Sequence, residues 1–325
     1  MPIPVDDSSG SALTPGLRAE FDSVYRARLN DDAWWRQLFR NVRAGGAYEI
    51  FHGYNAVPIP QVWLRGDARS EKGFGEFHKT VYVYDYELTL TWHENDEADE
   101  RLADGLVSRV REGAARLANW DELALLDLMQ GSAAYLHPAT DFTAYDSHPL
   151  YSSSHATRTG GNVVSGSGVA TAQDIKTDWF KVLAAFREMT DTEGEPYWRD
   201  TLDQARLLVV APPHLEEVMT EAFEASMILP AGSNAPVPNV LPKKARTDLV
   251  IWERLSTSNN DWYVFLTGVG DATPFLKLDR QAVRTRTWDF DNSDWSAQTK
   301  MKGMGFDIRA GYGVLNFHTT VQVNN

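Results

Sequence analysis

The stretch Tyr82–Trp92, with the sequence YVYDYELTLTW, alternates large apolar side chains with smaller or polar ones. In an extended chain, successive side chains point to opposite faces, so the large apolar ones share one face. We therefore predict a single strand of about 35 Å, roughly twice the common length, with one buried face. The predicted apolar face consists of Tyr82, Tyr84, Tyr86, Leu88, Leu90 and Trp92.

A long helix is predicted directly after this strand, over residues 94–118. Acidic residues gather at its start and arginines toward its end, which is the order that the helix dipole favours. Leucines, valines and alanines recur at helical spacing and form one apolar stripe. A shorter helix is predicted to run from Asp121, as its N-cap, to Gly131.

Before the strand, the segment Arg65–Gly73 interleaves opposite charges and has glycines near both ends. It lacks the apolar side chains needed to bury itself, so we predict a solvated loop flanked by extended chain. Mixed charges suit pairing at the rim of an inter-subunit contact, where they set register more than affinity. The candidate contact residues in this loop are Arg65, Asp67, Arg69, Glu71 and Lys72.

The first part of the chain, through about Ala44, is predicted to be helical in two segments. The first segment places Leu17 and Phe21 on one apolar face, and the second has a stripe that begins with Trp34 and Trp35. We predict that the paired tryptophans pack, either within their own subunit or as a further contact with a neighbouring one.

The second half of the chain mixes helices and strands. The stretch Thr171–Asp174 has the pattern of a capping box and predicts that a helix starts there. Further strands are predicted at residues 207–210, 249–252, 262–266, 275–278, 282–290 and 306–323. Because helices and strands do not alternate regularly, the predicted fold class is α+β.

The composition narrows the classes of function. The 325 residues include no cysteine, which excludes disulfides, thiolate metal sites and a cysteine nucleophile. The formal net charge of -14 disfavours nonspecific DNA binding, which depends on lysine and arginine. The start of the chain lacks the pattern of a secretory signal, and no apolar run approaches the ~20 residues that span a bilayer. We expect a soluble protein, made in the cytoplasm, with no membrane partner.

Three histidines, His137, His148 and His155, lie near Asp141 and Asp146 in a loop-rich part of the sequence. Zinc accepts such ligands, but their spacing matches no ligand signature, so we interpret these histidines as structural. The Gly-x-Ser-x-Gly turn and the phosphate-binding glycine motifs are missing. We assign no catalytic, cofactor-binding or metal-binding residue and expect a structural protein. A metal-dependent hydrolase that uses His148 and His155 is the alternative from another class.

The stretch Tyr145–Tyr151, YDSHPLY, is followed by His155 and then by Gly161-Asn162. This order resembles the Mu-like prophage major head subunit family, in which a Tyr-Asp-Gly-x-x-Leu-Phe type of segment precedes a histidine and a Gly/Asn turn. Ser147 stands where glycine is more usual, and Tyr151 where phenylalanine is. Later segments agree in order, and the resemblance covers roughly residues 60–325. These segments are Phe186–Met189, Val210–Pro213, Asn239–Leu241 and Arg309–Gly313.

The resemblance implies the tailed-phage major capsid fold of the Hong Kong phage type. It divides the chain into an N-terminal arm (1–50), an extended loop (51–80), a peripheral domain with the long strand and a spine helix (81–134), an axial domain (135–270) and the return strands of the peripheral domain (271–325). It implies self-assembly, in the host cytoplasm, into pentamers and hexamers of a virion shell that encloses double-stranded DNA without reading its sequence. It also implies partners: a scaffold or protease, a portal and decoration proteins. An encapsulin-like nanocompartment shell of the same fold is the alternative.

Overall fold

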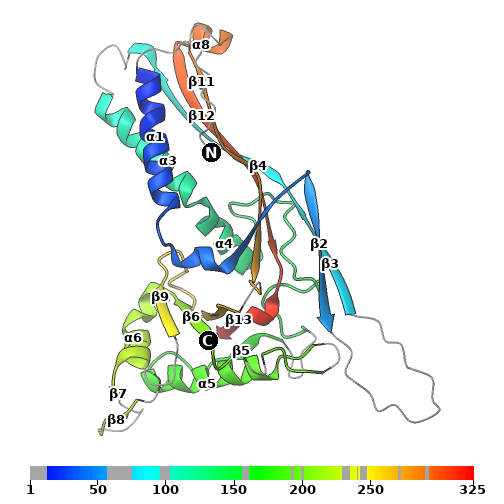
Figure 1. Cartoon of the computed structure of the whole chain (residues 1–325). Coiled ribbons are helices and arrows are strands. Elements are labelled where there is room, and N and C mark those ends of the chain that lie inside the picture. Colours follow the sequence, from blue (N-terminus) through cyan, green and yellow to red (C-terminus); the bar gives the residue numbers. More distant parts are fainter. Residues whose placement is uncertain are drawn as a thin grey trace, which may run out of the picture.

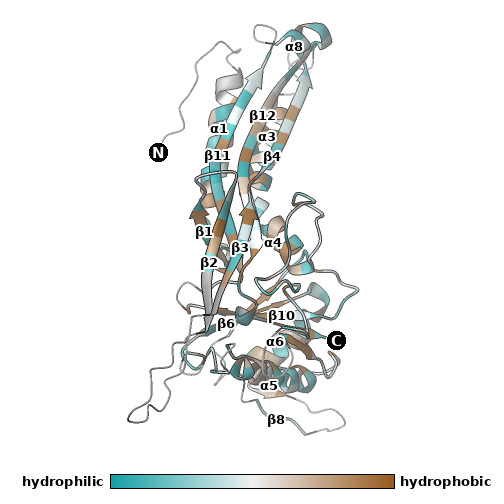
Figure 2. Ribbon diagram, turned by 90° about the vertical axis from the view of Figure 1, so that its right-hand side faces the viewer, coloured by the Kyte–Doolittle hydropathy of each residue, from teal (hydrophilic) through white to brown (hydrophobic). Residues whose placement is uncertain are grey.

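The computed structural model describes residues 13–56, 75–95, 103–155, 161–191, 194–198, 201–228, 235–239, 241, 247–269, 272–289 and 293–325. Within these residues, two β-sheets lie in opposite halves of an elongated molecule (Figure 1). A two-stranded ribbon, formed by β2 (Tyr48–Ala56) and β3 (Gly75–Tyr82), lies along one side, and α8 (Asp294–Thr299) and α5 (Ala172–Glu188) lie toward opposite ends (Figure 2).

The first half of the molecule is built on a four-stranded sheet in the order β1-β11-β12-β4. Its strands are β1 (Phe39–Arg43), β4 (Tyr84–His93), β11 (Phe275–Trp288) and β12 (Met301–Val314). Helices α1 (Leu13–Leu29) and α3 (Ala103–Ala118) lie side by side against this sheet (Figure 1). Phe21 of α1 stacks on Phe306 of β12 with ring centroids 3.7 Å apart, so the helices and the sheet share one core.

The predicted one-faced strand is confirmed for β4, in which exposed side chains alternate with half-buried ones. The half-buried Tyr86, Leu88 and Leu90 pack against the core. The prediction that Tyr82 opens the same strand is wrong, because the pairing changes at Val83. Residues up to Tyr82 pair with β2, whereas residues from Tyr84 onward pair with β12.

The first predicted helix is confirmed as α1, with Leu17 and Phe21 buried. The second is wrong, because residues 34–38 form a 3-10 helix, η1 (Trp34–Leu38), and the next five residues form β1. β1 pairs along its whole length with β11, and such tertiary pairing overrides local periodicity. Residues 13–43 of the expected N-terminal arm therefore pack on the body of their own subunit, and residues 1–12 lie outside the described residues.

The predicted short helix is present as α4 (Trp120–Gln130) and ends at Gly131, which has a left-handed backbone with φ 65°. Its predicted N-cap is wrong, because Asn119 occupies the cap position. Asp121 instead accepts hydrogen bonds from Lys277 Nζ at 2.8 Å and from Tyr312 Oη at 2.7 Å. These contacts fix α4 to strands β11 and β12.

The second half of the molecule is built on a five-stranded sheet in the order β5-β13-β10-β6-β9. Its strands are β5 (Val163–Ser165), β6 (Arg206–Ala211), β9 (Thr247–Ile251), β10 (Trp262–Thr267) and β13 (Thr320–Asn324). Alternate residues of β6 and β10 enter two different cores: one lies under α5 and α6 (Glu216–Glu224), and the other is continuous with the core around α4. The capping box predicted at Thr171–Asp174 is confirmed at the start of α5. The remaining elements are η2 (Pro213–Leu215), β7 (Met227–Ile228), β8 (Val237–Pro238) and η3 (Phe317–Thr319).

Two strand boundaries predicted near the C-terminus are wrong. Residues 275–278 and 282–290 do not form two strands: β11 is continuous over Phe275–Trp288, and register shifts between Asp279 and Arg284 absorb the break in the pattern. The single strand predicted over residues 306–323 is divided by η3, where the chain leaves the four-stranded sheet and enters the five-stranded one. The mixed α+β class is confirmed.

Candidate assembly surface on the β2–β3 ribbon

The β2–β3 ribbon consists of β2 (Tyr48–Ala56) and β3 (Gly75–Tyr82), which pair in antiparallel fashion with each other. Among the described strands, neither joins the four-stranded or the five-stranded sheet. Residues 57–74 between the two strands lie outside the described residues. The role of the predicted contact residues there stays a prediction; they are Arg65, Asp67, Arg69, Glu71 and Lys72.

The inner face of the ribbon is anchored by a buried lysine. Lys79 on β3 is only 5% exposed, and its Nζ donates to Asp141 Oδ2 at 2.5 Å and to the carbonyl oxygen of Thr143 at 2.7 Å. Burial lowers the pKa of Lys79, and its contact with Asp141 opposes that shift. Burial also pushes the pKa of Asp141 upward, but hydrogen bonds from Lys79 and Thr143 outweigh it and hold this pKa below its usual range. The pair ties the ribbon to the loop after α4.

Aromatic stacking reinforces this anchor at both ends of the same loop. Phe77 of β3 stacks on Tyr145 with ring centroids 4.0 Å apart. Tyr84, at the start of β4, stacks on His137 at the same distance, and its Oη donates to the carbonyl oxygen of Ala139 at 3.0 Å. The loop over residues 137–145 thus holds the base of the ribbon by packing as well as by charge.

The outer face of the ribbon carries large apolar side chains that are exposed. Tyr48 is 52% exposed, Ile50 46% and Tyr82 51%. Tyr48 and Tyr82 are directly opposite in the register, and their ring centroids lie 5.7 Å apart. Single exposed apolar side chains are ordinary, but a contiguous group of large ones marks an interaction surface. We name Tyr48, Ile50 and Tyr82 the ribbon patch.

The two predicted contact tryptophans pack within their own subunit. Trp34 is half-buried and meets Trp252 edge-on, with ring centroids 5.3 Å apart. Trp35 is 4% exposed and meets Phe39 edge-on at 6.5 Å. Contact with a neighbouring subunit stays a prediction for both residues, and Trp35 has little free surface to offer.

The loop histidines take part in packing and in local hydrogen bonds. Asp146 Oδ2 lies 2.6 Å from His155 Nδ1, while His155 Nε2 lies 3.1 Å from the carbonyl oxygen of Leu150. The His155 ring stacks on Phe317 at 3.8 Å and is met edge-on by His148 at 5.8 Å. Within the residues that the structure describes, no three side chains of the metal-binding types converge on one point.

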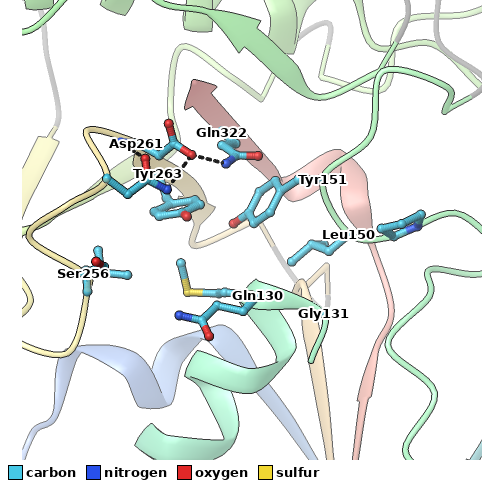
Figure 3. Close-up of a pocket in the computed structure, with 12 residues that line it drawn as sticks. Gln130, Gly131, Leu150, Tyr151, Ser256, Asp261, Tyr263 and Gln322 are labelled. Atoms are coloured by element: carbon cyan, nitrogen blue, oxygen red, sulfur yellow. Dashed lines mark hydrogen bonds between the residues drawn. The ribbon is translucent and has the colours of Figure 1, made fainter. Parts of the chain in front are cut away.

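A cavity of about 400 Å³ lies between the C-terminal end of α4 and the loop before β10 (Figure 3). Tyr151 and Tyr263 both line it, with ring centroids 5.2 Å apart. Asp261, at the edge of the cavity, accepts three hydrogen bonds. The donors are Asn259 Nδ2 at 3.0 Å, Gln322 Nε2 at 2.9 Å and the backbone N–H of Asn325 at 3.0 Å. Since neutral groups of the same chain engage this carboxylate, we interpret Asp261 as a structural residue that joins the loop before β10 to β13.

Sequence reasoning missed the anchor and the ribbon patch. Lys79 lies between Phe77 and Val81 on the inner face of β3. A lysine at a position where the strand pattern calls for an apolar side chain indicates a buried cation. Tyr48 and Ile50 also alternate correctly for a strand, but they fall at the end of the expected N-terminal arm (1–50), for which no strand is predicted from the sequence. No described helix is both long and apolar enough to span a bilayer.

Several solved structures share this fold at low sequence identity. A structure from Mycobacterium phage Patience matches with a TM-score of 0.55 at 11% identity, over 98% of this chain and 89% of that one. The capsid of cyanophage P-SCSP1u matches with a TM-score of 0.53 at 12% identity, over 89% and 87%. A virus-like particle from Pyrococcus furiosus matches with a TM-score of 0.51 at 10% identity, over 95% and 98%. The fold is therefore that of tailed-phage capsid proteins, the Hong Kong phage type.

The family model described as phage capsid protein matches residues 79–323. The chain belongs to this family, and it is a structural protein of the virion capsid rather than an enzyme. This assignment overturns the alternative of a metal-dependent hydrolase that uses His148 and His155. No match is found among curated protein sequences.

Proposed function

We propose that copies of this major capsid protein assemble into pentamers and hexamers of an icosahedral head shell, with the β2–β3 ribbon of each copy lying against a neighbouring copy. We further propose that the chain belongs to the Mu-like branch of capsid proteins, on the order of its motifs between Tyr145 and Pro213. The shell encloses double-stranded DNA, and a scaffold or protease, a portal and decoration proteins are the proposed partners.

The observation that carries this proposal is the contrast between the two faces of the ribbon. The inner face is fixed by Lys79 and Phe77, whereas the ribbon patch faces solvent in the isolated subunit. A short two-stranded ribbon is marginally stable by itself, so its anchoring at the base holds an apolar surface in place. Such a surface is suited to cover, and to be covered by, a second copy.

Energetics favour the ribbon patch as the main source of affinity at this contact. Full burial of one large apolar side chain contributes about 1.5–3 kcal/mol, and an icosahedral shell repeats each contact many times. The mixed charges at residues 65–72 then set the register of the contact, because charged rim pairs contribute to specificity more than to affinity.

The net charge of -14 supports enclosure without tight DNA binding. A shell with a basic inner surface would release counterions from the DNA at each phosphate contact and would therefore bind the genome tightly. An acidic subunit instead leaves the DNA to be held by confinement, and the proposal needs no sequence-specific contact.

Deletion of residues 65–73 tests the assembly role. We expect a folded subunit, with an unchanged circular dichroism spectrum, that forms no closed shells in size-exclusion chromatography and electron microscopy. A matched control replaces the same nine positions with a Gly/Ser segment of equal length. This variant keeps the length of the loop and removes its charges, so it separates the effect of lost charge from the effect of a shortened loop. Normal closed shells from the deletion variant would contradict the proposal.

A nanocompartment that holds protein cargo is the second candidate, supported by the likeness to the virus-like particle from Pyrococcus furiosus. The contents of particles purified from producing cells separate the two. DNA inside the particles agrees with a phage head, whereas a single co-purifying enzyme in every preparation would favour the nanocompartment.

A further inference from the structure

We propose that His52 and His78, next to the ribbon patch, form a two-histidine site for a divalent transition-metal ion such as Ni²⁺, Cu²⁺ or Zn²⁺. His52 lies on β2 and His78 on β3, and the two are directly opposite in the antiparallel register. Both side chains are exposed.

The register places the two imidazoles on one face of the ribbon. Side chains directly opposite in an antiparallel pair have Cβ atoms about 4.5–5.5 Å apart and project to the same side. Tyr48 and Tyr82, four residues away on each strand and on the same face, demonstrate this arrangement, since their rings are in contact at 5.7 Å. The intervening opposed pair, Ile50 and Thr80, keeps the same parity.

The chemistry of an exposed cross-strand pair favours metal over other ligands. Neutral imidazole is the commonest protein ligand for Zn²⁺, Cu²⁺ and Ni²⁺. Two such rings on neighbouring strands bind the ion as a chelate, and they leave the remaining coordination positions to water or to a group from another molecule. Among the described contacts, neither ring has a hydrogen-bond, ion-pair or ring partner that would have to be broken first. An antiparallel pair also fixes both backbones before the ion arrives.

The other six histidines offer no comparable pair on an exposed face. His155 and His318 are buried, and His148 packs edge-on against His155. His214 is exposed but isolated, with its Nε2 3.0 Å from Asn260 Oδ1. His214 is therefore a suitable control for metal binding by a single surface histidine.

Titration of the purified full-length protein with NiCl₂ by isothermal calorimetry tests the site. The wild-type protein is expected to bind one Ni²⁺ per chain. Loss of a residue that only hydrogen-bonds to a metal ligand typically weakens metal affinity by about tenfold or more. Loss of one of the two ligands themselves should weaken the affinity by at least as much. We therefore expect His52→Ala and His78→Ala each to weaken binding about tenfold or more, and His214→Ala to leave it unchanged.

Two results would overturn the proposal. The first is wild-type binding no stronger than that of the His52→Ala, His78→Ala double variant, which would show that the two rings merely lie beside each other. The second is loss of binding in His214→Ala instead. Both exposed substitutions should leave the circular dichroism spectrum unchanged, which separates loss of the ligands from loss of the fold.

Discussion

Lys79 and Asp141 are 62 positions apart in the sequence, yet Lys79 Nζ lies 2.5 Å from Asp141 Oδ2. This pair joins the ribbon to the loop after α4, so one contact links the proposed assembly surface to the body of the subunit. The two partners differ in environment: Lys79 is nearly buried, while half of the Asp141 side chain is exposed. Substitution of Lys79 therefore leaves the Asp141 carboxylate accessible to water.

Lys79→Ala is expected to lower the free energy of unfolding by about 1–3 kcal/mol, because it removes hydrogen bonds to Asp141 and to the Thr143 carbonyl oxygen and leaves a gap under the ribbon. Urea denaturation followed by tryptophan fluorescence measures this loss. Arg28→Ala is the control, because the Arg28–Asp31 pair is exposed on both sides and should contribute within about 0.5 kcal/mol. Equal effects of the two substitutions would contradict the anchoring role.

Gly311→Ala is expected to disturb the junction between the ribbon and the four-stranded sheet. A Cβ at Gly311 would lie 2.5 Å from the backbone carbonyl oxygen of Tyr82, which has no flexible end to move aside. Overpacking of this kind typically costs about 1–3 kcal/mol. Thermal unfolding measures the loss, and Gly105→Ala is the control: it has open space, lies within α3 and should be neutral or stabilising by about 0.5–1 kcal/mol. A Gly311→Ala variant as stable as wild type would show that the junction is loose.

His318 predicts a pH dependence of stability. Burial, together with the neighbouring His155, lowers the pKa of His318 to about 3. In the unfolded chain the value is about 6.5, so between about pH 6.5 and 3 the unfolded state binds more protons than the folded state. The free energy of unfolding therefore falls as the pH falls through this window, by up to about 1.4 kcal/mol per pH unit from this group.

Urea denaturation at pH 7, 6 and 5 tests this dependence. The variant His318→Gln keeps a polar group opposite Tyr145 Oη, which lies 3.2 Å from His318 Nε2, but it cannot titrate. We expect a shallower decline with falling pH in the variant than in wild type. Parallel curves would assign the pH dependence to other groups. The carboxylates of Asp141 and Asp146, whose pKa values are held low, contribute mainly below about pH 4.

Removal of the ribbon patch should weaken assembly without unfolding the subunit. The double variant Tyr48→Ser, Tyr82→Ser changes exposed side chains, so the free energy of unfolding should stay within about 1 kcal/mol of wild type. The subunit concentration needed for assembly should rise by at least about tenfold, since each lost burial is worth about 1.5–3 kcal/mol. Light scattering over a dilution series measures it, with Leu29→Ser, at an exposed position on α1, as the control. Unchanged assembly in the double variant would remove the patch from the interface.

Local patterns predicted local structure well. The alternation in β4, the stripe of α1, the capping box of α5 and the glycine at the end of α4 are all local signals, and each is present in the structure. The α+β class followed from the same patterns, and the capsid fold followed from the resemblance to a known family.

Two of the errors share one physical cause, which is contact between segments that are distant in the sequence. Residues 39–43 carry apolar side chains at helical spacing but become a strand because β11 lies beside them. Asp121 reads as a helix cap but binds Lys277 and Tyr312 instead. The Lys79–Asp141 contact could not be found from either residue alone, although a lysine at an inward position of a strand indicated that some anion had to meet it.

An electron cryo-microscopy reconstruction of the assembled shell tests the central claim most directly. The account predicts that Tyr48, Ile50 and Tyr82 of every ribbon are covered by a neighbouring copy, with the Lys79–Asp141 contact kept within each subunit. A closed shell in which these three side chains still face solvent would contradict it.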